Sequence, residues 1–243
     1  MPKNRIADEK IYVDSRYHDK PKEYFKLIEK AIRKNKVILP SEAGKVIMDI
    51  GCANGALLSY LGKTFSKTEL IGFEPVASLI EIGKKLDTRV KFINKGLFDI
   101  TTGDIKVKGD IVMATGVLGI FNDPSLFVKK LLSLVNGYKG KIFVFSPFNE
   151  EPIDVILKYR YSGNKNWEVG HNLFSMKTME TIAVQNKLSY EWIDFKMKIK
   201  ISKSDDPMRS WTEPFRGDPY HIIYGTNMFS TMKLLILTKT GAK

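Results

Sequence analysis

The sequence lacks several features that identify other classes of protein. It has one cysteine, Cys52, in 243 residues, so no intrachain disulfide or cysteine-based metal cage can form, which suits a reducing cytosol. No apolar run of ~20 residues could cross a bilayer, and no basic segment followed by an apolar stretch opens the chain. Carboxylates at metal-ligand spacing are also missing, because Asp205 and Asp206 are interpreted as a turn. We expect a soluble cytoplasmic protein without a metal site.

Arginine is scarce as well. Of the 39 basic residues, seven are arginine and the other 32 are lysine. The net charge of +12 suggests nucleic acid, phosphorylated molecules or an acidic membrane face as partners. Recognition of phosphates and bases, however, favours the planar, forked guanidinium, and the lysines are spread along the chain. The charge therefore indicates compositional bias more than a nucleic-acid partner.

Short apolar runs alternate with helical patterns in the first two thirds of the chain. The runs are 45–50, 70–74, 90–94, 110–115 and 141–146, and the helical patterns between them are 56–65, 76–86 and 124–135. Asp123 before Pro124 is a typical helix start. This alternation predicts a parallel sheet that is buried on both faces.

The regions on either side of this pattern predict accessory elements of one domain. Residues 1–243 allow a single well-buried domain. A helix at about 21–35 has apolar residues on one face, so we expect residues 1–40 to cover the domain. The irregular segments 147–175 and 203–226 are interpreted as insertions that form a lid over the substrate.

Three further elements are expected in the last third of the chain. A helix near 176–187 is opened by Ser175. Two long strands follow, at 190–202 and 228–240, on either side of the second insertion. These strands are expected to close the sheet.

The segment VIMDIGCANG, residues 46–55, joins the first strand to a helix through a glycine-rich turn. Gly51 and Gly55 leave backbone N–H groups bare at the carboxyl end of a strand, where α/β sheets bind ligands. Glu74 ends the next strand, where a carboxylate can accept hydrogen bonds from both hydroxyls of a ribose. The alternatives are a tight turn without a ligand and, for Glu74, local capping of the helix that starts at Pro75.

Two kinds of nucleoside cofactor compete for this turn. Dinucleotide enzymes carry G-x-G-x-x-G, so that the pyrophosphate can lie at a helix N-terminus. Here Gly51, Ala53 and Gly55 give G-x-A-x-G, and residue 56 is alanine. Asp49 does not suit a pyrophosphate but suits a cationic ligand that carries an amino acid. The turn therefore favours S-adenosylmethionine over NAD.

At these motifs the sequence resembles the class I S-adenosylmethionine-dependent methyltransferases. DIGCANG resembles their glycine-rich first motif, LIGFEPVASLIEIGKKL their second strand and helix, and KGLFDI the loop after their third strand. DIVMATGVLGIFNDP and GKIFVFSPFN resemble their fourth and fifth strands. The resemblance covers roughly residues 44–147 by motif and the C-terminal strands by pattern. It implies a Rossmann-like α/β fold with three α/β/α layers, a mostly parallel seven-stranded sheet and an antiparallel C-terminal strand.

The resemblance also implies the residues that bind S-adenosylmethionine and its product S-adenosylhomocysteine. These are Asp49, Gly51, Cys52, Ala53, Gly55, Glu74, Pro75, Leu97, Phe98, Asp99, Thr115 and Gly116. Asp99, with the backbone of Leu97 and Phe98, would face the adenine. Thr115 and Gly116 would lie under the sulfonium and the methyl group. An Asx-type turn is the alternative for Asp99.

Three positions depart from the family pattern or test it. Ala53 replaces the more usual glycine, and its methyl predicts a small shift. SPFN resembles a motif of methyltransferases that act on adenine amino groups, but it follows the fifth strand instead of the fourth, so Pro147 and Phe148 are interpreted as a turn or a wall of the pocket. Gly119 and Ile120 stand where many family members carry Glu-His, so no base is assigned there.

Glu74→Ala is expected to weaken cofactor binding with little change in melting temperature.

Candidates for a general base are few. Methyl transfer is an in-line displacement, so the nucleophile must be held ~3 Å from the methyl carbon, and a hydroxyl nucleophile also needs a base. Of three histidines, His171 and His221 fall in the insertions, and His171 is slightly favoured. Glu150 and Glu151 are the carboxylate alternatives. Each of these residues could equally be exposed or part of the packing.

The insertions are rich in aromatic residues and contain arginines. Such residues could bind a sugar and its phosphates or stack on an RNA base, or they could simply anchor long loops. The sequence predicts a methyltransferase for a small-molecule acceptor, such as a sugar, a nucleotide-linked sugar or another biosynthetic intermediate. An RNA or protein methyltransferase is the main alternative. An NAD-linked oxidoreductase and a non-catalytic S-adenosylmethionine-binding subunit are weaker ones.

Overall fold

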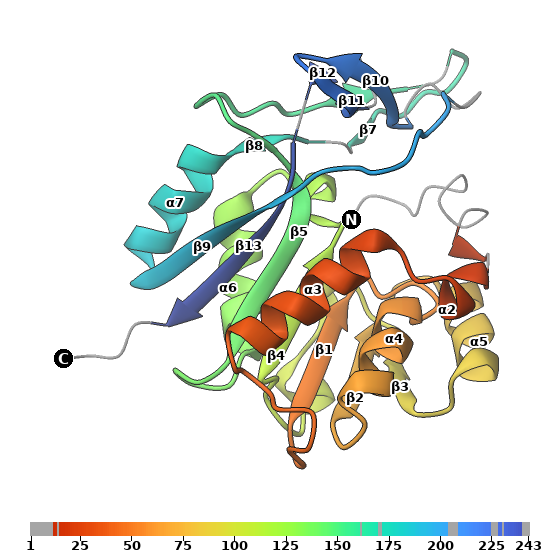
Figure 1. Ribbon diagram of the computed structural model, residues 1–243, viewed down its shortest axis with the longest axis vertical. Coiled ribbons are helices and arrows are strands. Elements are labelled where there is room, and N and C mark those ends of the chain that lie inside the picture. The colour runs from red at the N-terminus through yellow and green to blue at the C-terminus, as the bar shows by residue number, and fades with distance from the viewer. Residues whose placement is uncertain are drawn as a thin grey trace.

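A computed structural model describes residues 12–13, 15–160, 162–169, 172–203, 209–224, 228–229 and 231–239. A central sheet lies between helices on both of its faces, which gives three layers (Figure 1). The predicted α/β/α arrangement is confirmed. In the described part of the chain, no helix is long and apolar enough to cross a membrane.

The main sheet has the strand order β3-β2-β1-β4-β5-β13-β9. Its parallel strands are β1 (Val46–Ile50), β2 (Glu69–Phe73), β3 (Val90–Ile93), β4 (Ile111–Thr115) and β5 (Lys141–Asn149). β13 (Thr231–Lys239) runs antiparallel between β5 and β9 (Leu188–Phe195). The mostly parallel sheet with an antiparallel C-terminal strand is therefore confirmed. β8 (Phe174–Ser175) adds a short eighth strand, because it pairs with the end of β5.

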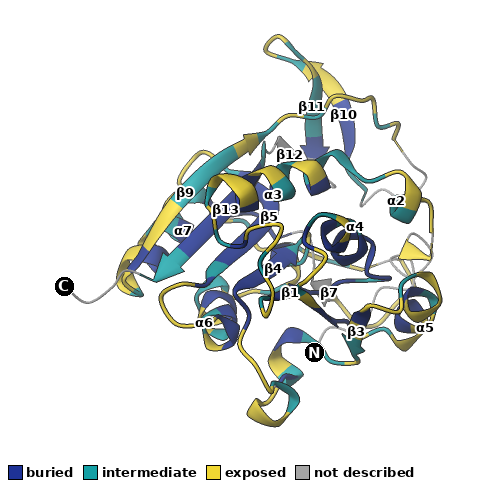
Figure 2. Ribbon diagram, turned by 60° about the horizontal axis from the view of Figure 1, so that its bottom comes forward, coloured by how far each residue is buried: buried dark blue, intermediate teal, exposed yellow. Residues whose placement is uncertain are grey.

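The helices divide between the two faces of this sheet. α3 (Glu23–Lys34) and α4 (Ala56–Thr64) pack on one face in one apolar cluster. α6 (Pro124–Leu134) and α7 (Met176–Gln185) pack on the other face in a second cluster. α2 (Arg16–Asp19) and α5 (Ala77–Leu86) lie near α4 at one side (Figure 1). Because helices cover both faces, β1 is buried along its whole length (Figure 2).

Two helices begin where the sequence predicts. The carboxylate of Asp123 accepts hydrogen bonds from the backbone N–H groups of Ser125 and Leu126 at the start of α6. The hydroxyl of Ser175 accepts one from the N–H of Thr178 at the start of α7. Both are N-caps that satisfy N–H groups left over at a helix start.

Three predicted strand boundaries are wrong. β5 continues through the SPFN segment to Asn149, so Pro147 and Phe148 lie in a strand and not in a turn. β9 ends at Phe195 instead of 202, because its pairing with β13 ends where Phe195 lies opposite Met232. The predicted strand 228–240 is divided, since β12 (Met228–Phe229) belongs to another sheet.

Two small sheets lie beyond the carboxyl ends of the parallel strands, at the top of Figure 1. β10 (Trp211–Phe215), β11 (Asp218–Tyr224) and β12 form one of them. β6 (Lys158–Tyr159) and β7 (Glu168–Val169) form the other. The two segments that the sequence identifies as insertions thus supply β6, β7, β10 and β11, whereas β12 lies just beyond the second insertion.

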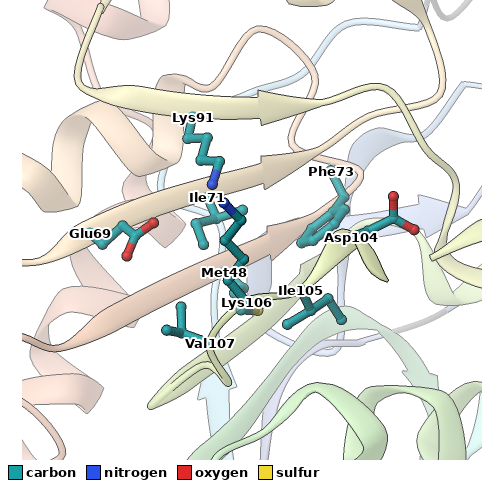
Figure 3. Close-up of a pocket in the computed structure, with 9 residues that line it drawn as sticks. All are labelled: Met48, Glu69, Ile71, Phe73, Lys91, Asp104, Ile105, Lys106 and Val107. Atoms are coloured by element: carbon teal, nitrogen blue, oxygen red, sulfur yellow. The ribbon is translucent and has the colours of Figure 1, made fainter. Parts of the chain in front are cut away.

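The connection between β3 and β4 contains only two short 3-10 helices, η1 (Leu97–Asp99) and η2 (Thr102–Asp104). Part of the sheet face is therefore covered by a loop instead of an α-helix. A cavity of about 200 Å³ lies there, floored by Met48, Ile71 and Phe73. Figure 3 shows Lys91 and Lys106 pointing toward each other across it.

Candidate active site

Asp49 lies near the carboxyl end of β1 with 1% of its surface exposed. One of its carboxylate oxygens, Oδ1, is buried and has no hydrogen-bond partner among the described residues. Burial, and to a smaller extent the charge of Glu74, raise the pKa of Asp49. A buried carboxylate is costly unless something pairs with it. A carboxylate oxygen without a hydrogen-bond partner at this position fits the ammonium group of an amino-acid ligand.

Two glycines in the turn after β1 are required because neighbouring side chains of the protein leave no room for a Cβ. Gly51 has φ +71°, and a Cβ there would lie 2.5 Å from Cγ1 of Val117. Gly55 has φ +78°, and a Cβ there would lie 2.7 Å from Cζ of Phe92. The close approach that the sequence attributes to a ligand is made at these two positions by the protein's own side chains.

Gly116, just after β4, has different surroundings. Its φ is +72°, but a Cβ there would meet nothing within 4 Å. Its N–H donates to the carbonyl of Phe145, which fixes the backbone at the end of the strand. Bare backbone next to open space at the carboxyl edge of the sheet is what a cofactor site needs.

The two residues between the glycines of the turn have distinct roles. Ala53 has φ +50°, a left-handed conformation that costs a residue with a Cβ about 1–2 kcal/mol. The thiol of Cys52 packs into the core, where a Cβ on Gly72 would lie 2.5 Å from its Sγ. Burial raises the pKa of this thiol. Only the backbone of Cys52 can therefore face a ligand in the crevice.

Glu74 links this turn to the end of β2. Its Oε2 accepts a hydrogen bond of 2.9 Å from the N–H of Ala53, and its Oε1 accepts one of 2.9 Å from the N–H of Val76. Only 5% of its surface is exposed, and burial raises its pKa against the effect of these two N–H groups. Each carboxylate oxygen keeps acceptor capacity for a hydroxyl. The capping alternative and the ribose interpretation are therefore compatible, while the neighbouring Pro75 is exposed.

The loop after β3 contains the three residues predicted to face the adenine, and the side chains of two of them lie outside the core. Leu97 is buried in the core, so only its backbone is available. Phe98 is 45% exposed, and its ring meets that of Phe121 edge-on at 5.4 Å. The carboxylate of Asp99 lies over Gly96, where a Cβ would come within 3.0 Å of Oδ2. An aromatic face and an acidic acceptor thus lie together at this edge.

Tyr24 reaches the end of β4 from helix α3. Its ring stacks on Phe145, which pairs with Thr115 of β4, with centroids 4.6 Å apart and planes at 14°. Burial strongly raises the pKa of Tyr24, so the phenol stays protonated. The sequence shows Tyr24 only as one residue on the apolar face of a helix, because the crossing of α3 over β4 and β5 is a tertiary feature.

A second cavity, of about 100 Å³, lies where β11 meets the ends of β5, β9 and β13. It brings together Glu150 and His221, two of the predicted catalytic residues. The Nδ1 atom of His221 lies 4.0 Å from Oδ2 of Asp218. His171 lies outside the described residues, and Glu151 is exposed. The sequence does not show that Glu150 and His221 share a cavity.

Lys233 is the most deeply placed charge of this cavity. Its side chain on β13 is 8% exposed, and its Nζ lies 2.7 Å from Asp194 and 3.3 Å from Glu150. These carboxylates raise the pKa of Lys233 against the effect of burial. A single lysine inside the apolar run of 228–237 is a signal that sequence reasoning could have used.

Aromatic side chains connect the two parts of the site. Phe145, which stacks on Tyr24, meets Phe195 edge-on at 5.3 Å. Phe195 in turn lines the smaller cavity. Three rings in contact, those of Tyr24, Phe145 and Phe195, therefore lead from α3 to the smaller cavity.

Asn172 is a further residue that the sequence does not identify. It is buried, and its side-chain N–H₂ group donates to the carbonyl of Phe121 and to Asn122. Its side-chain oxygen accepts from the N–H of Leu157. It thereby ties the first insertion to the loop after β4, which contains Gly119.

The aromatic residues and basic residues of the insertions interact with each other. The guanidinium of Arg160 lies 5.0 Å from the Trp167 ring centroid, and the ammonium of Lys203 lies 4.7 Å from that of Trp211. These pairs support the anchoring alternative for the aromatic residues. Within the described ranges, no group of three or more His, Cys, Asp or Glu side chains could hold a metal ion.

Comparison with known proteins gives a consistent result. Residues 18–193 match the methyltransferase domain family. A tRNA U34 carboxymethyltransferase from Campylobacter lari is 26% identical over 171 residues, which cover 62% of this chain. The match spans 57% of the length of that relative.

Solved structures show the same fold at low sequence identity. The plantazolicin methyltransferase BpumL, in complex with a triazolic desmethylPZN analogue and SAH, has a TM-score of 0.57 and 12% identity over 96% of this chain and 92% of its own. DesVI from Streptomyces venezuelae has a TM-score of 0.57 and 14% identity over 98% of this chain and 100% of its own.

Proposed function

Because this chain belongs to the methyltransferase domain family, the S-adenosylmethionine-dependent methyltransferases, we propose that it methylates a small polar molecule. A sugar, a nucleotide-linked sugar or another biosynthetic intermediate would suit. The observation that carries this proposal is the small, mixed-charge cavity between β11 and the sheet edge. The BpumL complex, which holds a desmethylPZN analogue and SAH, supports a small-molecule acceptor on this fold.

The donor half of the site fits S-adenosylmethionine, which supplies an activated methyl group on a sulfonium. We propose that Asp49 pairs with the ammonium of its amino-acid end, since one carboxylate oxygen has no hydrogen-bond partner among the described residues. Glu74 would accept hydrogen bonds from the ribose hydroxyls. Gly116 would leave room for the sulfonium at the end of β4, and Asp99 would accept from the adenine amine.

The acceptor half fits a molecule with several hydroxyl groups. The charged and polar residues that line the smaller cavity are Glu150, Asp194, Lys196, Asp218, Tyr220, His221, Thr231 and Lys233. They offer both hydrogen-bond donors and acceptors, and a hydroxyl uses both. The cavity of about 100 Å³ has room for about three water molecules at ~30 Å³ each, so it suits one polar end of an acceptor.

We propose His221 as the base that accepts the proton of an acceptor hydroxyl. Oδ2 of Asp218 lies 4.0 Å from Nδ1 of His221, too far for a hydrogen bond but near enough for the carboxylate to stabilise the charged imidazolium that forms. This proposal reverses the order in which the sequence ranks His171 and His221. Glu150, which faces the same cavity, remains the carboxylate alternative.

A tRNA acceptor is the second candidate. The Campylobacter lari relative and the net charge of +12 favour it. Against it, three carboxylates face the smaller cavity, where they would repel phosphates. Binding to RNA would also require a basic face whose affinity falls steeply with salt.

Transfer of labelled methyl groups tests these alternatives. The protein is incubated with labelled S-adenosylmethionine and either a filtered small-molecule extract or total tRNA. We expect acceptor-dependent label in material that passes a small-pore filter. Label retained with nuclease-sensitive material would replace the proposal by the tRNA alternative. Glu74→Ala is the negative control, because it removes the proposed ribose contact.

We also propose the cytosol as the location of the protein. Its one cysteine, Cys52, is a buried free thiol, which a reducing compartment would preserve. Detection of the protein in a membrane or secreted fraction would contradict this.

A further inference from the structure

The cavity of about 200 Å³ beneath the loop between β3 and β4 lies apart from both halves of the proposed active site. Its floor consists of Met48, Ile71 and Phe73, which belong to the apolar cluster that includes residues of α6 and α7. Met48 precedes Asp49 in β1, but successive side chains of a strand point to opposite faces of the sheet. Residues 104–107 of the loop line the other side of the cavity, where no α-helix covers the sheet.

We propose that this cavity is a binding site for a small aromatic carboxylate. The proposal does not depend on the proposed donor and acceptor sites, which share no residue with the lining of this cavity. It combines two features of the lining, an apolar floor that suits a ring and two lysines that suit a carboxylate.

Lys91 and Lys106 supply the positive charge of the cavity. Figure 3 shows the side chain of Lys91, on β3, and that of Lys106, in the loop, pointing toward each other across the cavity. Within the described part of the chain, neither side chain forms an ion pair. Two ammonium groups repel each other, and an anion between them replaces this repulsion by attraction. A carboxylate has two acceptor oxygens, so it can accept hydrogen bonds from both lysines.

The two acidic residues of the lining leave a surplus of positive charge. Asp104 accepts hydrogen bonds from Nζ of Lys95 at 2.9 Å and from the backbone N–H and the hydroxyl of Thr101 at 2.7 Å each. The contacts with Lys95 and Thr101 lower the pKa of Asp104 to about 2, so this carboxylate is charged but already paired. Glu69 is exposed at the start of β2, and no ion pair within the described ranges joins it to either lysine of the cavity.

The volume of the cavity indicates the size of its ligand. An apolar cavity of ~150 Å³ can hold one benzene molecule, and this cavity of about 200 Å³ has further space for a carboxylate. The floor favours an aromatic body, because the ring of Phe73 and the thioether of Met48 both make favourable contacts with aromatic rings. A cofactor-sized molecule is too large, since the pockets of such ligands measure ~300–1,000 Å³.

Titration with para-fluorobenzoate, followed by fluorine NMR, tests the proposal without an assay of methyl transfer. We expect saturable binding with a dissociation constant of about 1 mM, as for a small fragment. Two other probes separate the features of the ligand. para-Fluorobenzamide keeps the ring without the charge, and trifluoroacetate keeps the charge without the ring. Each should bind at least about 5-fold more weakly, because one loses the charge-assisted hydrogen bonds and the other loses the apolar contact.

The double variant Lys91→Gln/Lys106→Gln removes both proposed contacts of the carboxylate. Both positions are exposed, so the variant should fold, and an unchanged melting temperature checks this. We expect para-fluorobenzoate to bind about 5-fold more weakly, because exposed ion pairs contribute modestly. Lys67→Gln/Lys85→Gln is the matched control, since it removes two exposed lysines that do not line the cavity. Its affinity should stay within about 1.5-fold of that of the wild type, because salt screens distant charges.

Three results would overturn the proposal. They are the absence of saturable binding, an unchanged affinity in Lys91→Gln/Lys106→Gln, and equal losses in the two double variants, which would indicate a general effect of net charge. The titration is then repeated with saturating S-adenosylhomocysteine, and binding of para-fluorobenzoate should persist. Competition between the two ligands would place the ring in the proposed donor site and would also overturn the proposal. Failure of S-adenosylhomocysteine itself to bind would count against the proposed function and not against this cavity.

Discussion

The two halves of the carboxyl edge of the sheet differ in how they are built. On the proposed donor side, Asp49, Glu74 and Gly116 are held by strands buried on both faces and by backbone hydrogen bonds. On the proposed acceptor side, strands of two to seven residues from the insertions and the residues just after them lie beyond the sheet edge. Ion pairs and ring contacts replace the apolar core there.

This difference fits a division of roles, in which the proposed donor half binds a cofactor common to many proteins and the proposed acceptor half binds one particular molecule. Backbone geometry recognises a cofactor that many proteins share, and it leaves recognisable motifs in the sequence. Side chains on short strands recognise one particular acceptor, and they can change without disturbing the sheet. Substitutions on the donor side should therefore affect cofactor affinity, and substitutions on the acceptor side should not.

Glu74→Ala should have the largest effect on this comparison. Loss of two hydrogen bonds from a carboxylate, each worth ~1.5–3 kcal/mol, predicts S-adenosylmethionine binding weakened by at least about 100-fold. The sequence predicts little change in melting temperature, but the structure changes this expectation, because the N–H groups of Ala53 and Val76 lose their acceptor. We expect a loss of about 1–3 kcal/mol in unfolding free energy, measured by urea denaturation. Affinity equal to that of the wild type would rule out the ribose contact.

Asp49→Asn should weaken binding about 10-fold and stabilise the free protein by about 1 kcal/mol, because it removes a buried, incompletely paired charge. The native pKa of Asp49 is raised, so the native state binds this proton more strongly than the unfolded state does. The wild type therefore loses stability relative to the variant as pH rises above the usual aspartate value of 3.8. Denaturation curves at several pH values measure the difference, and one that does not grow with pH would contradict the raised pKa.

Gly116→Ala, with Gly137→Ala as its matched control, tests whether the open space beside β4 holds the cofactor. Both glycines have positive φ, +72° and +45°, and a Cβ at either would meet nothing within 4 Å. Each alanine should cost about 1 kcal/mol of stability for its left-handed backbone. Only Gly116→Ala should also weaken S-adenosylmethionine binding, in a calorimetric titration. Similar affinities for the two variants would mean that Gly116 does not border the cofactor.

Lys233→Met should have the smallest effect on the donor side. Its partners Asp194 and Glu150 are 72% and 63% exposed, so they return to water when the ammonium is removed, and we expect less than about 1 kcal/mol of lost stability. Affinity for S-adenosylmethionine should stay within about twofold on the same grounds. Methyl transfer to the small-molecule extract should fall. A large loss of cofactor affinity would show that the two halves of the edge are coupled.

The fold was predictable to the extent that it depends on local patterns. Alternating apolar runs identified the five parallel strands, and Asp123 and Ser175 marked two helix starts that the structure confirms. The end of β9 could not be predicted, because it depends on where β13 begins to pair with it. The SPFN segment was misinterpreted for a similar reason, since pairing with β13 and β8 keeps Phe148 in a strand.

The site divides in the same way. The places of the proposed donor residues in the fold were predictable, because motif order puts them at the ends of neighbouring parallel strands; their roles stay predictions. The positions of Tyr24 and Asn172 were not predictable, because each residue comes from a segment that is distant in sequence from its partners. No spacing within α3 indicates that Tyr24 stacks on Phe145. Lys233 did leave a signal, a lysine within an apolar run, but its partners Asp194 and Glu150 are known only from the structure.

The sequence by itself determined the α/β fold, the glycine-rich turn and the two carboxylates that follow the first two strands. These depend on local backbone preferences and on burial periodicity, which adjacent residues encode. Only the tertiary structure decided that Glu150 and His221 share a cavity with Lys233 and that Tyr24 stacks on Phe145. Such contacts depend on how helices and strands cross, and packing between distant segments sets that crossing.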